Sequence, residues 1–315
     1  MGSKKLIVIV GPTAVGKTGL AIRLAKRLGT EIVSADSRQI YSELVIGTAK
    51  PSANELKEVP HYFVGVKLIG EEYDAGQYGR DALTLIHQLF EKHNEVILCG
   101  GSGLYIKAVT EGFDELPDVP PEIREKIMKE YDEKGLSWLQ DRVKEIDPEY
   151  FSIVDQKNPH RLVRALELNY VAGKPVGELR QRKKHLHPFA VVKVGLELDR
   201  EALFRQIDVR MDKMIETGLF EEAKLLYSRR DQNALQTVGY QEVFGFLDGL
   251  YDQEEAIRLL KRNSRRYAKR QLTWFKKDPE TKWFNPEQLD EIVKFVSGLE
   301  SPNWKESLAA GKRIQ

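Results

Sequence analysis

The hydrophobic residues of this chain form short continuous runs, and these alternate with longer segments in which apolar residues recur at helical spacing. Leu6 to Val10 is an unbroken, mostly β-branched run that ends at Gly11-Pro12, as is typical of a central strand buried on both faces. From Lys17 to Leu28 the apolar positions recur at helical spacing, and Gly29 predicts the end of that helix. Further strands are predicted at 31–34, 62–66 and 96–99, with a helix over 75–93. This alternation predicts an α/β fold built on a parallel sheet.

The pattern changes after residue 112. Leu116 to Pro121 is rich in proline, which neither a helix interior nor a central strand tolerates, so this stretch predicts a boundary. Three helices are predicted next, at 122–134, 136–146 and 159–171, and strand character returns at 190–198. We therefore predict a catalytic core over 1–112, an inserted helical subdomain over 113–189, and a resumed core with a helical C-terminal region over 190–315.

Composition narrows the class of protein. The 315 residues are 41% hydrophobic and 31% charged, as in soluble globular proteins, and no apolar run approaches the roughly 20 residues needed to cross a bilayer. The chain enters its first predicted strand without a signal-peptide pattern, so we expect a cytoplasmic protein with no membrane partner. Cys99 is the only cysteine, which excludes an internal disulfide and a multi-cysteine zinc site. With a net charge of +1, any nucleic-acid surface must come from local clustering.

A phosphate-binding motif lies between the first predicted strand and helix. Gly11 to Thr18 fits G-x-x-x-x-G-K-[ST], the P-loop pattern of nucleotide-binding and ATP-binding proteins, in the context that supports such a match. Backbone N–H groups of such a loop face phosphate oxygens, Lys17 would neutralise the phosphate, and Thr18 would bind Mg²⁺. The residues predicted to hold phosphate are Gly11, Pro12, Thr13, Ala14, Val15, Gly16, Lys17 and Thr18. The motif predicts phosphate binding and leaves the reaction open.

Asp36 follows the second predicted strand at 31–34. Its carboxylate should therefore point into the crevice at the carboxyl edge of the sheet, near the P-loop. There it could bind Mg²⁺ or accept a proton from an attacking nucleophile. The alternative is an aspartate that only caps the following turn.

A basic run near the C-terminus is a candidate nucleic-acid surface. Lys261 to Lys277 contains no acidic residue and is interleaved with three aromatic residues. Basic residues of this kind bind phosphates, and aromatic rings can stack on splayed bases. Alternatively, the aromatic residues of this helix face the core. A second basic cluster consists of Arg180 with residues 182–184.

Several blocks together resemble the bacterial tRNA dimethylallyltransferase family, also called IPP transferases. They extend over most of the chain, and their order and spacing leave little room for another P-loop family. Besides the P-loop, the blocks are Asp36 to Tyr41, Ile46 to Pro51, Val59 to His61, Gly100 to Tyr105, Arg161 to Glu167 and Val238 to Tyr240.

The resemblance implies an unusual use of the P-loop, which would hold the diphosphate of dimethylallyl diphosphate without hydrolysing a nucleoside triphosphate. The exocyclic N6 amine of the adenine 3′ to the anticodon would attack the first carbon of the dimethylallyl group while diphosphate leaves. Asp36 matches the family's general base, and Lys17, Thr18, Mg²⁺ and Arg210 would stabilise the leaving diphosphate. Without the resemblance, Arg210 would be interpreted as part of a solvated helix face.

The resemblance also implies base flipping, because an adenine within a folded anticodon loop must leave its stack to reach a buried base. We expect the anticodon stem-loop of tRNA and dimethylallyl diphosphate as partners, and a monomeric enzyme. Ser102 stands where the family commonly has Thr, and His160 where it has Gln. The residues implied to contact tRNA are Asp36, Ser37, Arg38, Gln39, Ser102, Arg124, His160, Arg161, Leu162, Val163, Arg164, Gln236, Thr237, Val238, Gly239, Tyr240 and Gln241.

Three other functions remain as alternatives. An isopentenyltransferase that acts on free adenine nucleotides would share the P-loop and Asp36, but it needs neither a helical insert nor a long basic helix. A P-loop kinase of small molecules would turn over ATP. A non-enzymatic RNA-binding protein that senses nucleotide would leave Asp36 without a role.

Overall fold

The computed structural model describes residues 4–114, 116–179 and 186–298. The chain divides into two compact units. The core unit combines the residues up to Thr110 with those from Leu186 onward, and the insert extends from Glu111 to His185. The sequence prediction placed the insert at 113–189, with both ends slightly further along the chain.

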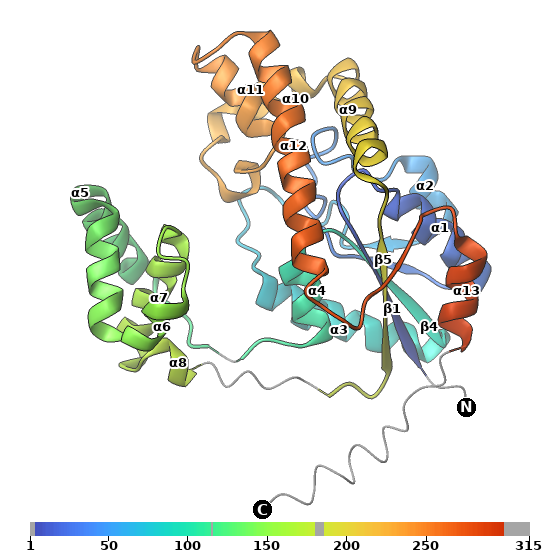
Figure 1. The fold of residues 1–315 in the computed structure, drawn as a ribbon, viewed down its shortest axis with the longest axis horizontal. Coiled ribbons are helices and arrows are strands. Elements are labelled where there is room, and N and C mark those ends of the chain that lie inside the picture. The colour runs from blue at the N-terminus through green and yellow to red at the C-terminus, as the bar shows by residue number, and fades with distance from the viewer. Residues whose placement is uncertain (1–3, 115, 180–185, 299–315) are drawn as a thin grey trace, which may run out of the picture. The chain divides into compact units, whose positions relative to one another are not determined.

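The described part of the core unit contains a six-stranded sheet, in the order β3-β2-β4-β1-β5-β6 (Figure 1). Every neighbouring pair of strands is parallel. Because β5 pairs with β1, the sheet resumes after the insert, and the predicted parallel α/β fold is confirmed. The strands are β1 Lys5–Val10, β2 Ile32–Ser34, β3 His61–Tyr62, β4 Glu95–Cys99, β5 Ala190–Leu196 and β6 Lys282–Phe284.

Two strand predictions were inaccurate. The strand predicted at 62–66 ends at Tyr62, because Phe63 and Gly65 both adopt left-handed backbone angles with φ of 61° and 64°. The edge strand β6, Lys282–Phe284, was missed within a region predicted to be mostly helical. A strand of three residues is too short to show an alternating pattern.

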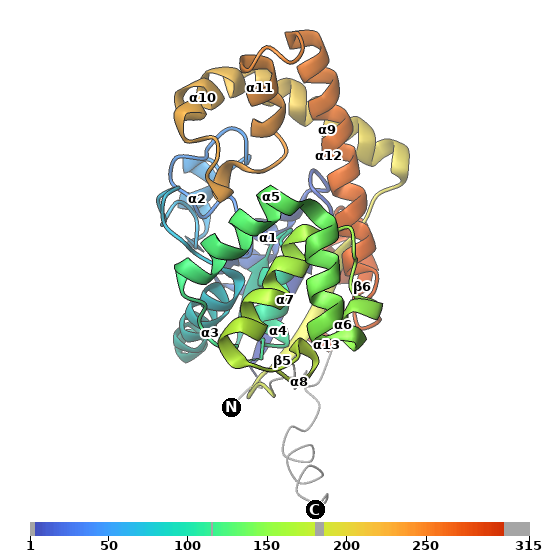
Figure 2. The same ribbon diagram turned by 90° about the vertical axis from the view of Figure 1, so that its left-hand side faces the viewer.

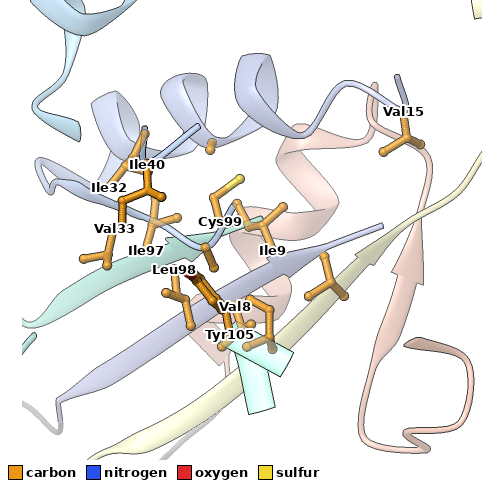
Figure 3. Packing of buried hydrophobic residues seen from close by; sticks show 14 of the residues in the cluster. Val8, Ile9, Val15, Ile32, Val33, Ile40, Ile97, Leu98, Cys99 and Tyr105 are labelled. Atoms are coloured by element: carbon orange, nitrogen blue, oxygen red, sulfur yellow. The ribbon is translucent and has the colours of Figure 1, made fainter. Parts of the chain in front are cut away.

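The centre of the sheet is buried on both faces. Residues Leu6 to Val10 are at most 2% exposed, as expected for a strand covered by helices on both sides. Val8 lies opposite Leu98, and Figure 3 shows both on the side of Tyr105, whereas Ile9 and its partner Cys99 extend from the opposite face. The apolar run seen in the sequence therefore packs against two separate helical layers.

Helices cover the sheet and continue beyond its carboxyl edge (Figure 1). One layer consists of α1 and α13, which pack together, and the other of α3 and α4. Helices α9 to α12 form a contiguous array beyond the strand ends. The helices of the core unit are α1 Lys17–Leu28, α2 Ala53–Glu58, α3 Ala75–Lys92, α4 Gly103–Thr110, α9 Arg200–Glu216, α10 Leu219–Leu226, α11 Tyr240–Leu247, α12 Gln253–Phe275 and α13 Leu289–Gly298, with short 3₁₀ turns at Tyr227–Arg229 and Asn233–Leu235.

The insert is helical and has a hydrophobic core of its own. Figure 2 shows α5 beside α7, and their apolar faces pack together. The break predicted between two helices at residue 135 is present within α5, where Gly135 has φ 76° and ψ −173°. The helices of the insert are α5 Pro121–Ile146, α6 Pro148–Ile153, α7 Pro159–Ala172 and α8 Val176–Leu179. Among all described residues, no helix is long and apolar enough to cross a membrane.

Candidate active site

The loop between β1 and α1 has the geometry that its glycines predict. Gly11 has φ 148°, and a Cβ atom there would lie 2.7 Å from the carbonyl oxygen of Leu196. Gly16, with φ 96°, is the N-cap of α1 and has no side chain to cap the first turn. That turn also contains no acidic residue. The N-terminus of α1 therefore has the features of an anion-binding site.

A cavity of about 540 Å³ lies beside this loop and is lined by residues of the core unit. Lys17 and Thr18 line it from the start of α1, and Asp36 from the turn after β2. Arg210 and Tyr267 reach it from α9 and α12, far along the chain. The four residues expected to be catalytic from the sequence therefore line a single cavity.

Lys17 is a buried cation held by the P-loop backbone. Its Nζ donates hydrogen bonds to the carbonyl oxygens of Gly11, at 2.9 Å, and Pro12, at 2.7 Å. Burial lowers the pKa of Lys17 from 10.5 to about 8, and the nearby Arg210 lowers it as well, whereas Asp36 opposes this effect. A bound anion would stabilise the charged form of this amine.

Arg210 does not belong to a solvated helix face, which corrects the interpretation based on sequence alone. It is half-buried on α9, its Nη2 lies 3.5 Å from the carbonyl oxygen of Thr48, and burial lowers its pKa. Its Nε is buried and has no hydrogen-bond partner among the described residues. A buried donor without a partner costs about 1–3 kcal/mol, so an anion in the cavity would be stabilised by Arg210.

Asp36 caps the turn that follows β2, as in the alternative interpretation. Its Oδ1 accepts the backbone N–H groups of Arg38, at 2.9 Å, and Gln39, at 3.2 Å. Its Oδ2 accepts no hydrogen bond from the described residues, and the side chain lines the cavity. Capping through one oxygen therefore leaves the other for chemistry.

Hydrogen bonds join two of the segments expected to contact tRNA and link them to the chain just before a third. Ser102 Oγ accepts the N–H of Ser37 at 2.9 Å and lies 3.1 Å from the Ser37 hydroxyl oxygen. The guanidinium of Arg38 donates to the carbonyl oxygen of Asn233 at 2.9 Å. The turn after β2 is thereby connected to residue 102 and to the segment that leads into 236–241.

The segment 236–241 contains both exposed and structural residues. Gln236 and Gln241 are exposed, and the amide of Gln241 donates to Oε1 of Gln236 at 2.7 Å. Tyr240 is completely buried, and its hydroxyl donates to Glu222 at 2.6 Å. The side chain of Tyr240 therefore supports the fold, whereas Gln236 and Gln241 are exposed and Thr237 and Val238 are half-buried.

Two arginines of the insert share one buried carboxylate. Nη1 of Arg124 lies 3.7 Å from Oε1 of Glu167, and Nη1 of Arg164 lies 3.2 Å from Oε2. Glu167 is 2% exposed, whereas the side chain of Arg124 is 64% exposed and that of Arg164 is 42% exposed. Both guanidinium groups lie beside the same carboxylate, whose single negative charge balances only one of their two positive charges.

The start of α7 was expected to contact tRNA as one continuous segment, from residue 160 to 164. His160 and Arg161 are exposed and agree with that expectation. Leu162 and Val163 are instead buried in the hydrophobic core of the insert. The side chains of these two residues pack against α5 and the rest of that core, so they are not available to RNA.

The basic run on α12 is partly neutralised by acids from other elements. Arg265 pairs with both carboxylate oxygens of Asp208, at 3.1 and 2.8 Å, and Lys261 lies 2.6 Å from Asp212. Both acids come from α9, more than 40 residues earlier in the chain. The absence of acidic residues within the run therefore does not make the whole helix face cationic.

On a different face of α12, the basic side chains are not paired with any described acidic residue. Arg266 and Lys269 are exposed and form no ion pair with any described residue. With Arg270 and Trp274 they line a second cavity of about 390 Å³. Of the three aromatic residues, only Phe275 packs in the core as the alternative proposed. The second basic cluster predicted, Arg180 with 182–184, lies outside the described residues.

Gln271 is a site residue that the sequence analysis missed. It is 7% exposed on α12 and lines the main cavity. Its Oε1 accepts the N–H of Thr13 at 2.7 Å, and its Nε2 donates to the carbonyl oxygen of Gly101 at 2.9 Å. It therefore fixes the P-loop relative to the loop after β4. The available signal was a glutamine three residues after Ala268 and four before Phe275, a spacing that puts all three on one face of a helix.

These observations define the class of the protein. It is an α/β protein in which the loop that carries the P-loop sequence motif opens into a cavity at the carboxyl edge of a parallel sheet. The sequence model of the IPP transferase family matches residues 39–278. The chain therefore belongs to the IPP transferase family, as its motifs indicated.

Individual relatives agree with this assignment. The chain is 53% identical to the tRNA dimethylallyltransferase of Cytophaga hutchinsonii, over 93% of this chain and 97% of that protein. It is 47% identical to tRNA dimethylallyltransferase 1 of Bacteroides fragilis, over 94% and 98% of the two chains. The crystal structure of the full-length tRNA isopentenylpyrophosphate transferase from Bacillus halodurans is similar, with a TM-score of 0.70, 38% identity, and coverage of 94% and 96%.

Proposed function

We propose that this chain is a tRNA dimethylallyltransferase. It transfers the dimethylallyl group of dimethylallyl diphosphate to the N6 amine of the adenine 3′ to the anticodon and releases diphosphate. The relatives described above carry this name. The observation that carries the proposal is the single cavity in which P-loop residues and Arg210 face Asp36.

Lys17 and Arg210 would bind the diphosphate. Both are cations whose burial lowers their pKa, and Nε of Arg210 has no hydrogen-bond partner among the described residues. An anion would therefore interact strongly with both. Negative charge grows on the leaving oxygen as its bond to carbon breaks, so both cations would stabilise the transition state more than the substrate.

Asp36 would accept the proton of the attacking amine. A bond forms between N6 and the first carbon of the dimethylallyl group, while the bond from that carbon to the diphosphate oxygen breaks. The electron pair of the broken bond leaves with diphosphate, and the N6 proton passes to Asp36. Backbone hydrogen bonds to Oδ1 would hold the carboxylate in place during this transfer.

The residues of the cavity fit a magnesium ion that binds together with diphosphate. Among the described residues, no group of three or more His, Cys, Asp or Glu side chains could hold a metal without other ligands. Mg²⁺ commonly takes one or two protein oxygens and completes its shell with substrate phosphate and water. Thr18 would supply a hydroxyl ligand, with Asp36 lining the same cavity. When bound, the ion would add positive charge at the leaving group.

The tRNA would be contacted by both units of a monomeric, cytoplasmic enzyme. In the core unit, the exposed glutamines of segment 236–241 and the unpaired basic face of α12 support this proposal. In the insert, the support comes from His160, Arg161 and the pair formed by Arg124 and Arg164. Basic residues that bind phosphates would orient the RNA, while the flipped adenine enters the cavity.

Incubation with labelled dimethylallyl diphosphate and Mg²⁺ tests the proposal directly. With tRNA, we expect label in the RNA, released by nuclease and phosphatase digestion as N6-dimethylallyladenosine. Parallel incubations contain free adenosine monophosphate in place of tRNA, or labelled ATP in place of the prenyl donor. Label on the free nucleotide but not on tRNA would favour the nucleotide isopentenyltransferase. Turnover of ATP would favour the kinase.

A further inference from the structure

One carboxylate in the core unit accepts four hydrogen bonds from two directions. Glu222, on α10, accepts the N–H groups of three successive residues, Val45 at 3.2 Å, Ile46 at 2.8 Å and Gly47 at 2.9 Å. It also accepts the hydroxyl of Tyr240, from α11, at 2.6 Å. The side chain of Glu222 thus ties two helices of the C-terminal array to a loop of the N-terminal half of the chain.

The contact between the loop and Tyr240 is close. A Cβ atom at Gly47 would lie 2.6 Å from the ring of Tyr240, so only glycine fits at this position. Burial raises the pKa of Tyr240 far above its usual value, and the hydrogen bond to Glu222 raises it further. Tyr240 therefore remains a hydrogen-bond donor to Glu222 throughout the physiological pH range.

The same loop, residues 45–49, reaches the main cavity. The carbonyl oxygen of Thr48 accepts a hydrogen bond from Nη2 of Arg210 at 3.5 Å, the one hydrogen bond that Arg210 makes with the described residues. The carbonyl oxygens of Thr48 and Ala49 also accept Nε2 of Gln39, each at 3.1 Å. The position of the Arg210 guanidinium thus depends on a loop whose backbone is held by Glu222.

We propose that Glu222 is a positioning residue for the transfer reaction. Glu222 lies outside the cavity lining, and it acts by holding loop 45–49 so that the Thr48 carbonyl orients Arg210 toward the diphosphate. A displacement of about 1 Å at a catalytic group can lower a rate by about 100-fold, so an indirect contact of this kind has catalytic consequences. The inference rests on the proposed function of the cavity.

The variant Glu222→Gln tests this role with little change in shape. An amide replaces one acceptor oxygen with a donor, so at least one of the four hydrogen bonds is lost. With saturating tRNA and dimethylallyl diphosphate, we expect the single-turnover rate to fall about 10- to 100-fold. The dissociation constant for tRNA should change less than about threefold, because no contact with RNA is removed. Glu221→Gln, on the same helix and exposed, is the matched control and should transfer at the normal rate.

A double-mutant cycle separates positioning of Arg210 from a general structural role. If Glu222 acts through Arg210, adding Glu222→Gln to Arg210→Ala should lower the rate less than about threefold further. Tyr240→Phe removes only one of the four hydrogen bonds and should lower the single-turnover rate less. This loss, too, should be smaller when Arg210 is already replaced by alanine. This milder variant keeps the test valid if Glu222→Gln unfolds at the assay temperature, which thermal unfolding of every variant would reveal.

Three results would overturn the inference. They are a normal rate for Glu222→Gln, equal losses from Glu222→Gln in the presence and absence of Arg210, and a tRNA affinity that falls as much as the rate. A wild-type protein that transfers no dimethylallyl group to tRNA would instead overturn the proposed function. The two failures are therefore distinguishable in one set of measurements.

Discussion

The pKa of Lys17 predicts how binding of the prenyl donor depends on pH. Burial lowers this pKa from 10.5 to about 8. A bound diphosphate would place negative charge near the amine and raise the pKa again. Below pH 8 the free protein already carries the ammonium, so affinity should be constant. Above pH 8 the protein must take up a proton in order to bind, so affinity should fall as pH rises.

The expected loss of affinity can be calculated from the lowered pKa of Lys17. At pH 9, one unit above the pKa, only about one-tenth of the free protein carries a charged Lys17. Affinity should therefore fall about tenfold between pH 7 and pH 9, or about 1.4 kcal/mol. Phosphate esters complete their second ionisation near pH 6, so the ligand keeps its charge in this range. Burial raises the pKa of Cys99 and of Tyr267 to about 12, so neither group should titrate between pH 7 and pH 9.

Isothermal titration calorimetry can measure both the affinity and the proton uptake. The ligand would be an unreactive analogue of dimethylallyl diphosphate, with sulfur at the bridging position, in the presence of Mg²⁺ and saturating anticodon stem-loop RNA. Titrations at pH 7, 8 and 9 in two buffers of different ionisation enthalpy should give an uptake close to one proton at pH 9. Lys17→Arg keeps its charge at every pH, so any binding by this variant should show no such dependence.

Constant affinity from pH 7 to pH 9, with no proton uptake, would refute the reasoning. That result would mean that Lys17 is already fully charged in the free protein at pH 9, or that its amine does not face the diphosphate. A steeper fall than tenfold would indicate a second group that must be protonated for binding.

Three further predictions concern single positions. Asp36→Asn should lower the single-turnover rate about 10²- to 10⁴-fold without changing the unfolding midpoint, because asparagine keeps the Oδ1 that caps the turn. A normal rate, or rescue by extra Mg²⁺, would exclude the base role. Joint replacement of Arg266 and Lys269 by glutamine should reduce the salt dependence of tRNA binding by about two units of slope. Arg265→Gln should leave that slope unchanged, because its guanidinium is already paired. Gly47→Ala should destabilise the fold by about 1–3 kcal/mol in denaturant unfolding, since its Cβ would collide with an aromatic ring. An unfolding curve identical to that of the wild type would show that the loop can move.

The α12 helix shows where interpretation of the sequence reached its limit. The run from Lys261 to Lys277 contains no acid, and this local fact predicted a cationic surface. In the structure, Arg265 and Lys261 are paired with acids of α9, and only another face of the helix keeps its charge. Helical periodicity can predict which residues share a face, but it cannot identify the element that packs against that face.

The sequence by itself determined the features whose causes are local. The P-loop glycines, the buried strand before them and the helix after them are specified within about 25 residues, because backbone angles and apolar spacing are properties of neighbouring residues. Asp36 was placed at a strand end for the same reason. The family followed from the order of several such blocks along the chain.

Only the tertiary structure decided how distant groups meet. It placed Arg210 in the cavity, joined Gln271 to the P-loop, and brought Glu222 to a loop 175 residues earlier in the chain. It also buried Leu162 and Val163, which the family pattern had placed at the RNA. Burial and hydrogen-bond pairing depend on which surfaces pack together, and that packing is set by the whole folded chain, so no single segment of the sequence records it.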